Sequence, residues 1–172
     1  MPRAANNGSA DTTINLGNAS NRFKDLHLSG DVIAPNIVAS NGVFLGGTSN
    51  ANKLDDYEGG TWTPVVGSGT YTASYARYTK IGRRVFIDCR IELTGTRTTA
   101  SFTVGGFPFT SRSGNYTAGN VIAQNYTGGA EWLSVLSLAS ADYVVFQEQG
   151  SDAQGTEFAN GYLIFSISYE VA

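Results

Sequence analysis

Two short stretches of the chain combine aromatic side chains with amide, hydroxyl and glycine neighbours, at 112–116 and 125–132. Aromatic faces pack on the apolar side of sugar rings while polar groups bind the ring hydroxyls, so this pattern indicates glycan recognition. Both stretches have a loop-like composition, and binding residues commonly sit in loops on a rigid scaffold. The alternative for the aromatic residues is packing in the core or between subunits. The candidate ligand-binding residues are Arg112, Asn115, Tyr116, Asn125, Tyr126, Glu131 and Trp132.

The acidic residues do not predict an active site. Glycan-cleaving enzymes use a pair of carboxylates as acid and base, and the chain has 14 acidic residues from which a pair could be built. Asp88 and Glu92, however, stand on the polar side of a predicted strand beside arginines, which favours charge pairing across the sheet. Asp55 and Asp56 fit a turn better than a catalytic or metal site. We therefore expect no catalytic residue and no enzymatic activity.

The single histidine and the single cysteine limit the chemistry further. His27 lies far from the serine-rich part of the chain, so a catalytic triad is not expected and a structural or inter-subunit role is. Cys89 occupies an inward strand position, where a thiol behaves as a small apolar side chain. A metal site of histidines and cysteines is not expected with one of each. A carboxylate-only Ca²⁺ site stays open, although no EF-hand loop is present, and no cofactor is expected.

Composition and charge exclude several partners. The net charge is -3 and no cluster of lysine and arginine forms the basic stripe that binds phosphates. No apolar run approaches the roughly 20 residues of a membrane span. The first residues lack the apolar core of a signal peptide. We expect neither nucleic-acid binding nor membrane insertion.

Residues 14–53 carry apolar patches of a few residues separated by glycine, asparagine and serine, after a polar start at 1–13 that reads as disordered. Such a segment is too short to bury its patches alone. Three copies wound around one axis would share them as an intertwined stalk. The alternative is an arm packed on the main domain. The residues expected to pack in the stalk are Ile14, Leu16, Phe23, Leu26, Leu28, Val32, Ile33, Phe44 and Leu45.

Residues 54–172 follow a period of two, which predicts an all-β head domain. Along 84–93, apolar residues alternate with mostly polar ones, and 75–81 is the expected hairpin partner through a turn at Gly82-Arg83. About eight short strands separated by glycine-rich turns indicate a β-sandwich of the jelly-roll kind. The predicted strands are 61–66, 75–81, 84–93, 101–104, 120–126, 132–138, 143–147 and 162–171.

The residues at the start of the head domain indicate how the chain enters it. Gly59-Gly60 permits a sharp change of direction, and Pro64 suits an edge strand because it has no amide proton to donate. Trp62 is expected to plug the boundary between stalk and head. Leu54 and Tyr57 are assigned to the same junction.

Two motifs resemble stretches of tailed-bacteriophage fibre proteins. Residues 16–30, LGNASNRFKDLHLSG, are similar to the "LG…RF.DLYLSG" stretch of those fibres, with His27 in place of the usual tyrosine. Residues 54–64, LDDYEGGTWTP, are similar to the "LDDYEEGTWTP" signature of phage structural proteins. A "Y.KIG..V" segment follows that signature, and 78–85 supplies it. The resemblance covers 16 to about 93, a little under half the chain.

This resemblance implies a homotrimeric fibre with a stalk and a β-sandwich head that attaches to a glycan or protein receptor on the bacterial surface. It implies contacts with other tail or baseplate proteins, synthesis in the host cytoplasm and residence in the virion. A purely structural decoration or baseplate protein is the alternative. A depolymerase is less expected, since such tailspikes usually hold their groove on a long β-helix. The chain has neither the self-cleaving domain nor the long upstream portion of many relatives, so it is a short protein or a fragment.

Overall fold

The computed structural model describes residues 20, 25–46, 48–49, 52–54, 56–129 and 132–172. It divides the chain into two units, residues 1–38 and 39–172. The expected disordered start at 1–13 lies outside the described residues, and so do three of the stalk residues (Ile14, Leu16 and Phe23) and one candidate ligand residue (Glu131). In the first unit, the described residues 25–38 form neither strand nor helix, and their side chains are exposed.

The second unit is almost entirely β, which confirms the predicted fold class at that level. Its one described helical element is a 3₁₀ turn, η2 (Gly155–Glu157). The described strands are β1 (Val43–Phe44), β2 (Lys53–Leu54), β3 (Tyr57–Thr61), β4 (Val65–Val66), β5 (Thr70–Ile81), β6 (Arg84–Thr94), β7 (Thr103–Gly105), β8 (Thr117–Ala123), β9 (Leu133–Ser137), β10 (Tyr143–Glu148), β11 (Ser151–Asp152) and β12 (Gly161–Glu170). β1 and β2 form a separate two-stranded hairpin.

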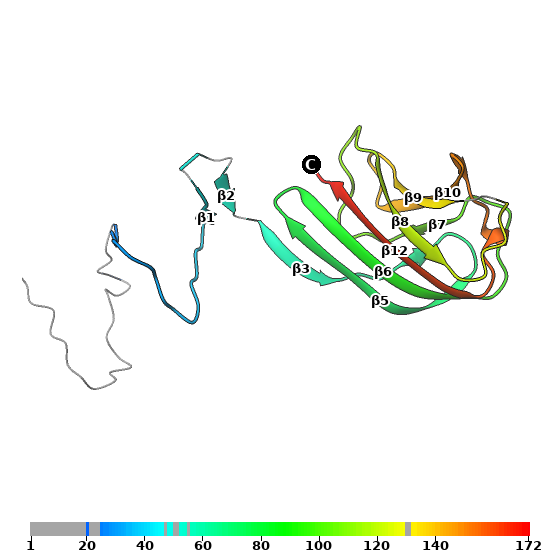
Figure 1. The fold of residues 1–172 in the computed structure, drawn as a ribbon, viewed down its shortest axis with the longest axis horizontal. Helices are drawn as coiled ribbons and strands as arrows, with labels where there is room; N and C mark the ends of the chain where they lie inside the picture. The colour runs from blue at the N-terminus through cyan, green and yellow to red at the C-terminus, as the bar shows by residue number, and fades with distance from the viewer. Residues whose placement is uncertain (1–19, 21–24, 47, 50–51, 55, 130–131) are drawn as a thin grey trace, which may run out of the picture. The chain divides into compact units, whose positions relative to one another are not determined.

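The remaining strands form one ten-stranded antiparallel sheet that curls over on itself (Figure 1). Its order is β3-β5-β6-β12-β8-β9-β10-β7-β4, with β11 beside β10. We call β3, β5, β6, β12 and β8 the long half, and β9, β10, β7, β4 and β11 the short half. The predicted sandwich is thus one sheet whose halves remain joined through β8.

β8 makes the bend because it changes partners along its length. Residues 120–123 pair with β12, whereas 117–119 pair with β9. Gly119 lies at the point of change. A Cβ there would sit 2.8 Å from the Cβ of Ile167 and 2.9 Å from Cγ1 of Val135, and closer still to the carbonyl oxygen of Ser166. The corner therefore needs a residue without a side chain.

The two edges of the curled sheet are consecutive in sequence. β3 is one edge and β4 the other, and only residues 62–64 separate them. Pro64 lies in this crossing and in no strand, so the predicted strand 61–66 is instead divided into the end of β3 and β4. The Trp62 backbone N–H donates to the carbonyl of Ala76, and its indole N–H donates to the carbonyl of Arg77 at 3.3 Å. Both hydrogen bonds tie Trp62 to β5, and its ring packs on Phe107, which follows β7.

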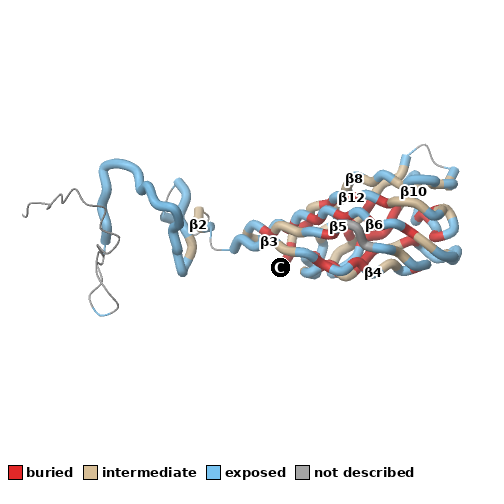
Figure 2. The backbone as a smooth tube through the Cα atoms, turned by 90° about the horizontal axis from the view of Figure 1, so that it is seen from below, coloured by how far each residue is buried: buried red, intermediate tan, exposed pale blue. Residues whose placement is uncertain are grey.

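Alternation along the long strands fills the space between the halves. In β6 the residues Val85, Ile87, Cys89, Ile91 and Leu93 are buried while those between them are exposed, as the sequence predicted. In β12 the predicted inward face is also confirmed, with buried residues at 163, 165, 167 and 169. Figure 2 shows this alternation as changing colours along the tube.

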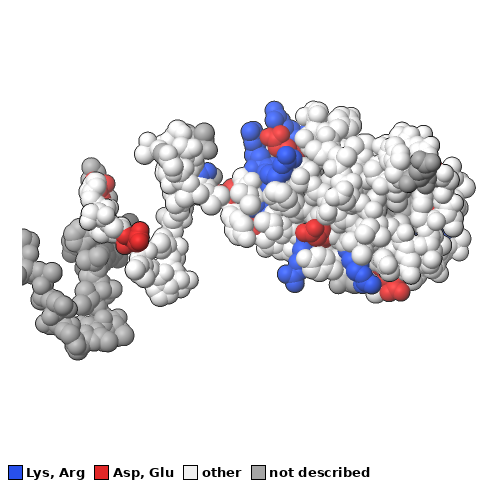
Figure 3. Space-filling model, in the orientation of Figure 1, with Lys and Arg blue, Asp and Glu red and all other residues white. Residues whose placement is uncertain are grey.

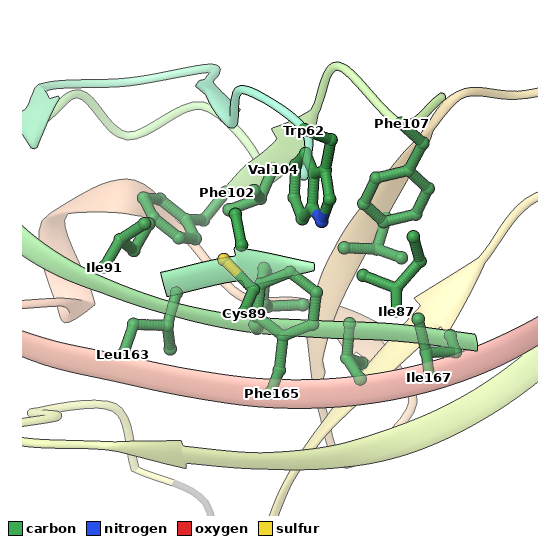
Figure 4. Close-up of a cluster of buried hydrophobic side chains, with 14 of the residues drawn as sticks. Trp62, Ile87, Cys89, Ile91, Phe102, Val104, Phe107, Leu163, Phe165 and Ile167 are labelled. Carbon is green, nitrogen blue, oxygen red and sulfur yellow. The ribbon is translucent and has the colours of Figure 1, made fainter. Parts of the chain in front are cut away.

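The core is rich in aromatic rings from both halves. Trp62 meets Phe107 edge to face with ring centroids 5.0 Å apart, and Phe107 stacks on Tyr169. Figure 4 shows Trp62 and Phe107 facing the side chains of β6 and β12. A second group joins Phe102 to Phe158, whose stacked rings are 4.3 Å apart. These large rings hold the curled halves together by burying apolar area.

Candidate binding surfaces

The two loop stretches predicted to bind a ligand lie at opposite ends of β8. Residues 112–116 precede the strand and contact the end of β12, whereas 125–127 follow it and contact the region before β12. A seven-residue strand spans about 20 Å. The structure therefore separates the two stretches, and they do not form one site.

The first stretch lies at the end of the head where β3 begins, which we call the entry end. The Arg112 guanidinium is 3.5 Å from the Glu170 carboxylate, and Arg83 pairs with the same carboxylate. Asn115 accepts the backbone N–H of Glu170. In Figure 3 one group of basic side chains lies at this end, near the C-terminus marked in Figure 1, and others lie lower on the head. Arg112 and Asn115 thus anchor the end of β12, while the ring of Tyr116 is 64% exposed.

The second stretch lies at the opposite end, which we call the far end. Asn125 has a φ of 57°, a backbone conformation that asparagine tolerates, and its amide donates to the carbonyl of Asn160 at 3.0 Å. The Tyr126 hydroxyl donates to the Glu148 carboxylate, and its ring packs on Phe158. Burial, with help from that hydrogen bond, raises the pKa of Tyr126. These two residues hold the loop, and Trp132 remains 54% exposed.

The described stalk residues have exposed side chains. Ile33 is 96% exposed, and Val38 is 94% exposed. Phe44 sits in the hairpin of β1 and β2, two strands of two residues each, which is too small to bury its side chains. The predicted packing residues Leu26, Leu28, Val32, Ile33, Phe44 and Leu45 are all exposed. Figure 2 shows the described part of this segment mostly in pale blue, the colour of exposed residues.

At the entry end, the 54–64 motif lies beside the 78–85 segment. β3 carries part of that motif and pairs with the end of β5, where the 78–85 segment begins, so that Gly60 lies opposite Tyr78. A Cβ at Gly60 would be 2.8 Å from the Tyr78 ring, so the glycine admits that ring. Lys80, whose side chain is 10% exposed, forms an ion pair with Asp56. Of the three junction residues, Trp62 is buried, and Leu54 and Tyr57 are exposed.

The outer face of the long half carries a feature that sequence reasoning missed. An open depression of about 740 Å³ lies over β6, β12 and β8, and Tyr75 of β5 lines it as well. Asp88, Ser166 and Asn120 line it, and strand register places them side by side, because Asp88 pairs with Ser166 and Ser166 with Asn120. Arg77 pairs with Asp88 and extends this line onto β5, beside the depression. We call these four residues the polar row. All four are exposed on the outer face.

A second line of residues runs beside the polar row. Tyr75 pairs with Arg90, Arg90 with Ile164, and Ile164 with Ile122. All are exposed, and we call Tyr75, Ile164 and Ile122 the apolar shelf. The residues of the polar row and the apolar shelf lie on separate strands and share no pattern in the sequence, because only strand register brings them together. The one hint was the alternation of β6, which placed Asp88 outward.

The described residues offer little for metal or acid–base chemistry. No group of three or more histidine, cysteine, aspartate or glutamate side chains among them is arranged to hold a metal ion. Cys89 is buried, and burial raises the pKa of its thiol to about 12. His27 is exposed. Within the part of the chain that the structure covers, no helix has the length and apolar character to cross a membrane.

Comparison with known proteins adds no relative. No protein-family model, curated protein or solved structure matches this chain.

Proposed function

We propose that the chain is the distal module of a bacteriophage tail fibre, which attaches to a glycan on the host cell surface as a homotrimer. The observation that carries this proposal is the exposed apolar side chains of residues 26–45. Soluble single chains rarely leave a series of large apolar side chains in water. The sequence motifs that resemble phage fibres support the same assignment.

The same segment from sister chains is the partner best suited to cover the apolar side chains of residues 26–45. Burying one large apolar side chain stabilises by about 1.5–3 kcal/mol, and residues 26–45 offer several such side chains with little regular structure of their own. Identical segments around one axis would cover one another with matching spacing. Closed symmetry also limits the assembly to a fixed number of chains.

The all-β head supports the attachment role. A stiff sheet with a large aromatic core presents its outer faces and loops without rearrangement, which lowers the entropic cost of binding. In the proposed fibre, the N-terminal part would join other tail or baseplate proteins within the virion, and the head would face the host. No catalytic step is proposed.

Mass in dilute solution tests the trimer. We expect multi-angle light scattering to give three times the chain mass of 18.2 kDa. Ile33→Asp should reduce that mass, because three carboxylates would meet where apolar side chains pack. Val65→Asp is the matched control, since it adds the same charge to an exposed residue on an edge strand, where charge is tolerated. A monomeric wild-type chain would overturn the fibre proposal.

Adhesion is tested with the labelled full-length chain on a panel of bacterial strains. Binding to some strains that is lost after periodate oxidation of surface sugars is the expected result. Binding that survives periodate but is lost after protease treatment would point to a protein receptor. A trimer that binds no strain but binds purified virions would instead be a decoration protein.

A further inference from the structure

The outer face of the long half combines hydrogen-bonding groups and an apolar surface in two parallel lines. The polar row crosses four strands, so its ends are about 14 Å apart, with Arg77 at one end and Asn120 at the other. The apolar shelf lies beside it in the depression of about 740 Å³. Depressions of roughly 300–1,000 Å³ are typical of sites for small ligands.

The unbroken register of the β5–β6 hairpin turns two of these side chains outward. From Tyr75 to the turn, β5 pairs residue by residue with β6, so Tyr75 lies opposite the exposed Arg90 and Arg77 opposite the exposed Asp88. A β-bulge between Ala73 and Tyr75 ends this register, since Ala73 pairs with the buried Ile91. Bulges are over-represented where a sheet re-aims a side chain towards a site.

Neighbouring rings hold the two arginines of this face. The Arg77 guanidinium lies 5.4 Å from the centre of the Tyr75 ring, and the Arg90 guanidinium lies 5.6 Å from that of Tyr162. Such cation–π contacts restrict flexible side chains before a ligand arrives. Asp88 lies opposite Arg77 across the strands and two residues from Arg90 along β6, with Ser166 on its other side. The two guanidinium groups are therefore restrained beside an acceptor.

We propose that this face binds the receptor glycan, with the polar row holding sugar hydroxyls and Tyr75 packing against a sugar ring. Carboxylate and amide groups bind adjacent hydroxyls in pairs, and guanidinium groups donate to hydroxyl or carboxylate oxygens. The row repeats these groups along a line, which suits a linear oligosaccharide lying across the strands. This assignment rests on the attachment function proposed above and names the surface that performs it.

A second copy of the chain fits this face less well. Interface cores are depleted of charged residues, whereas Asp88 and Arg90 stand on β6, the middle strand of the long half, and Arg77 lies opposite Asp88. A flat apolar partner would remove water from these charges without replacing their hydrogen bonds, which is costly. A sugar keeps such groups hydrogen-bonded because it carries hydroxyls on most of its carbons.

The test measures binding of the full-length chain to an array of purified bacterial O-antigen and capsular oligosaccharides. Tyr75→Ala and Asp88→Asn should each weaken binding to the recognised glycan about tenfold or more, since each removes one good contact. Asp88→Asn keeps the shape of the side chain, so it tests the site even if Tyr75→Ala folds poorly. Tyr143→Ala is the matched control, because Tyr143 is an exposed tyrosine of β10 in the short half, and its binding should match the wild type.

Several outcomes would overturn the assignment. Full glycan binding by both Tyr75→Ala and Asp88→Asn, with loss in Tyr116→Ala or Trp132→Ala, would move the site to the loops and leave the attachment function standing. A fall in particle mass for Ile122→Asp would show that the face is a contact between copies. A chain that binds no glycan and no bacterial strain would refute the attachment function and this site together.

Discussion

The buried thiol of Cys89 should make the stability of the folded chain depend on pH. Its thiol faces the core from the middle of β6, and burial raises its pKa from 9.0 to about 12. Between these values the unfolded chain loses the thiol proton and the folded chain keeps it. Stability supplied by the protonated thiol is therefore complete below about pH 9 and is lost as the pH rises towards 12, by about 1.4 kcal/mol per pH unit.

Urea unfolding at a series of pH values from 8 upward would measure this loss, and Cys89→Ala isolates it. From about pH 9 to 10 we expect a shallower fall in the free energy of unfolding for Cys89→Ala than for the wild type. Above about pH 10, Tyr126 and Tyr169 add to the fall in both proteins, because burial raises the pKa of each hydroxyl. Parallel curves below pH 10 would contradict the assignment to Cys89.

At the scale of an element, β8 decides how the sheet curls. The strand can pass from β12 to β9 only because the backbone of Gly119 lies where a side chain would meet Ser166, Ile167 and Val135. Gly119→Ala should lower the free energy of unfolding by about 1–3 kcal/mol, since main chain as well as side chains must shift.

Gly129→Ala provides the comparison for this element. A Cβ at Gly129 would meet only a flexible carboxylate oxygen of Glu148, at 3.8 Å. Chemical denaturation should therefore give nearly wild-type stability for Gly129→Ala and a clear loss for Gly119→Ala. Equal losses of stability in the two variants would mean that the bend at Gly119 accepts a side chain without additional strain.

At the scale of the whole molecule, stability and assembly should be coupled if three chains share their apolar segments. The unfolding temperature of the wild type should then rise over a roughly hundredfold increase in chain concentration, because association favours the folded state by mass action. Differential scanning fluorimetry would follow this shift. Ile33→Asp should remove the dependence, and a wild-type midpoint that stays constant would argue that the chains fold independently.

The sequence by itself determined the elements whose pattern is local. The alternation along 84–93 and 162–171 identified β6 and β12 and their inward faces, because a period of two is a property of neighbouring residues. The turn at Gly82-Arg83 placed β5 beside β6 for the same reason. Cys89 was expected in the core on this pattern, and it lies there.

Only the tertiary structure decided which distant residues meet. The extra residue in β5 lies between Ala73 and Tyr75 and shifts the faces of the residues before it, and a single residue of bulge carries almost no signal in a sequence. The polar row depends on the register of four strands, of which only β5 and β6 are joined by a short turn, and register is fixed by packing of the whole sheet. For the same reason, the two loop stretches that looked alike in sequence came to lie at opposite ends of β8.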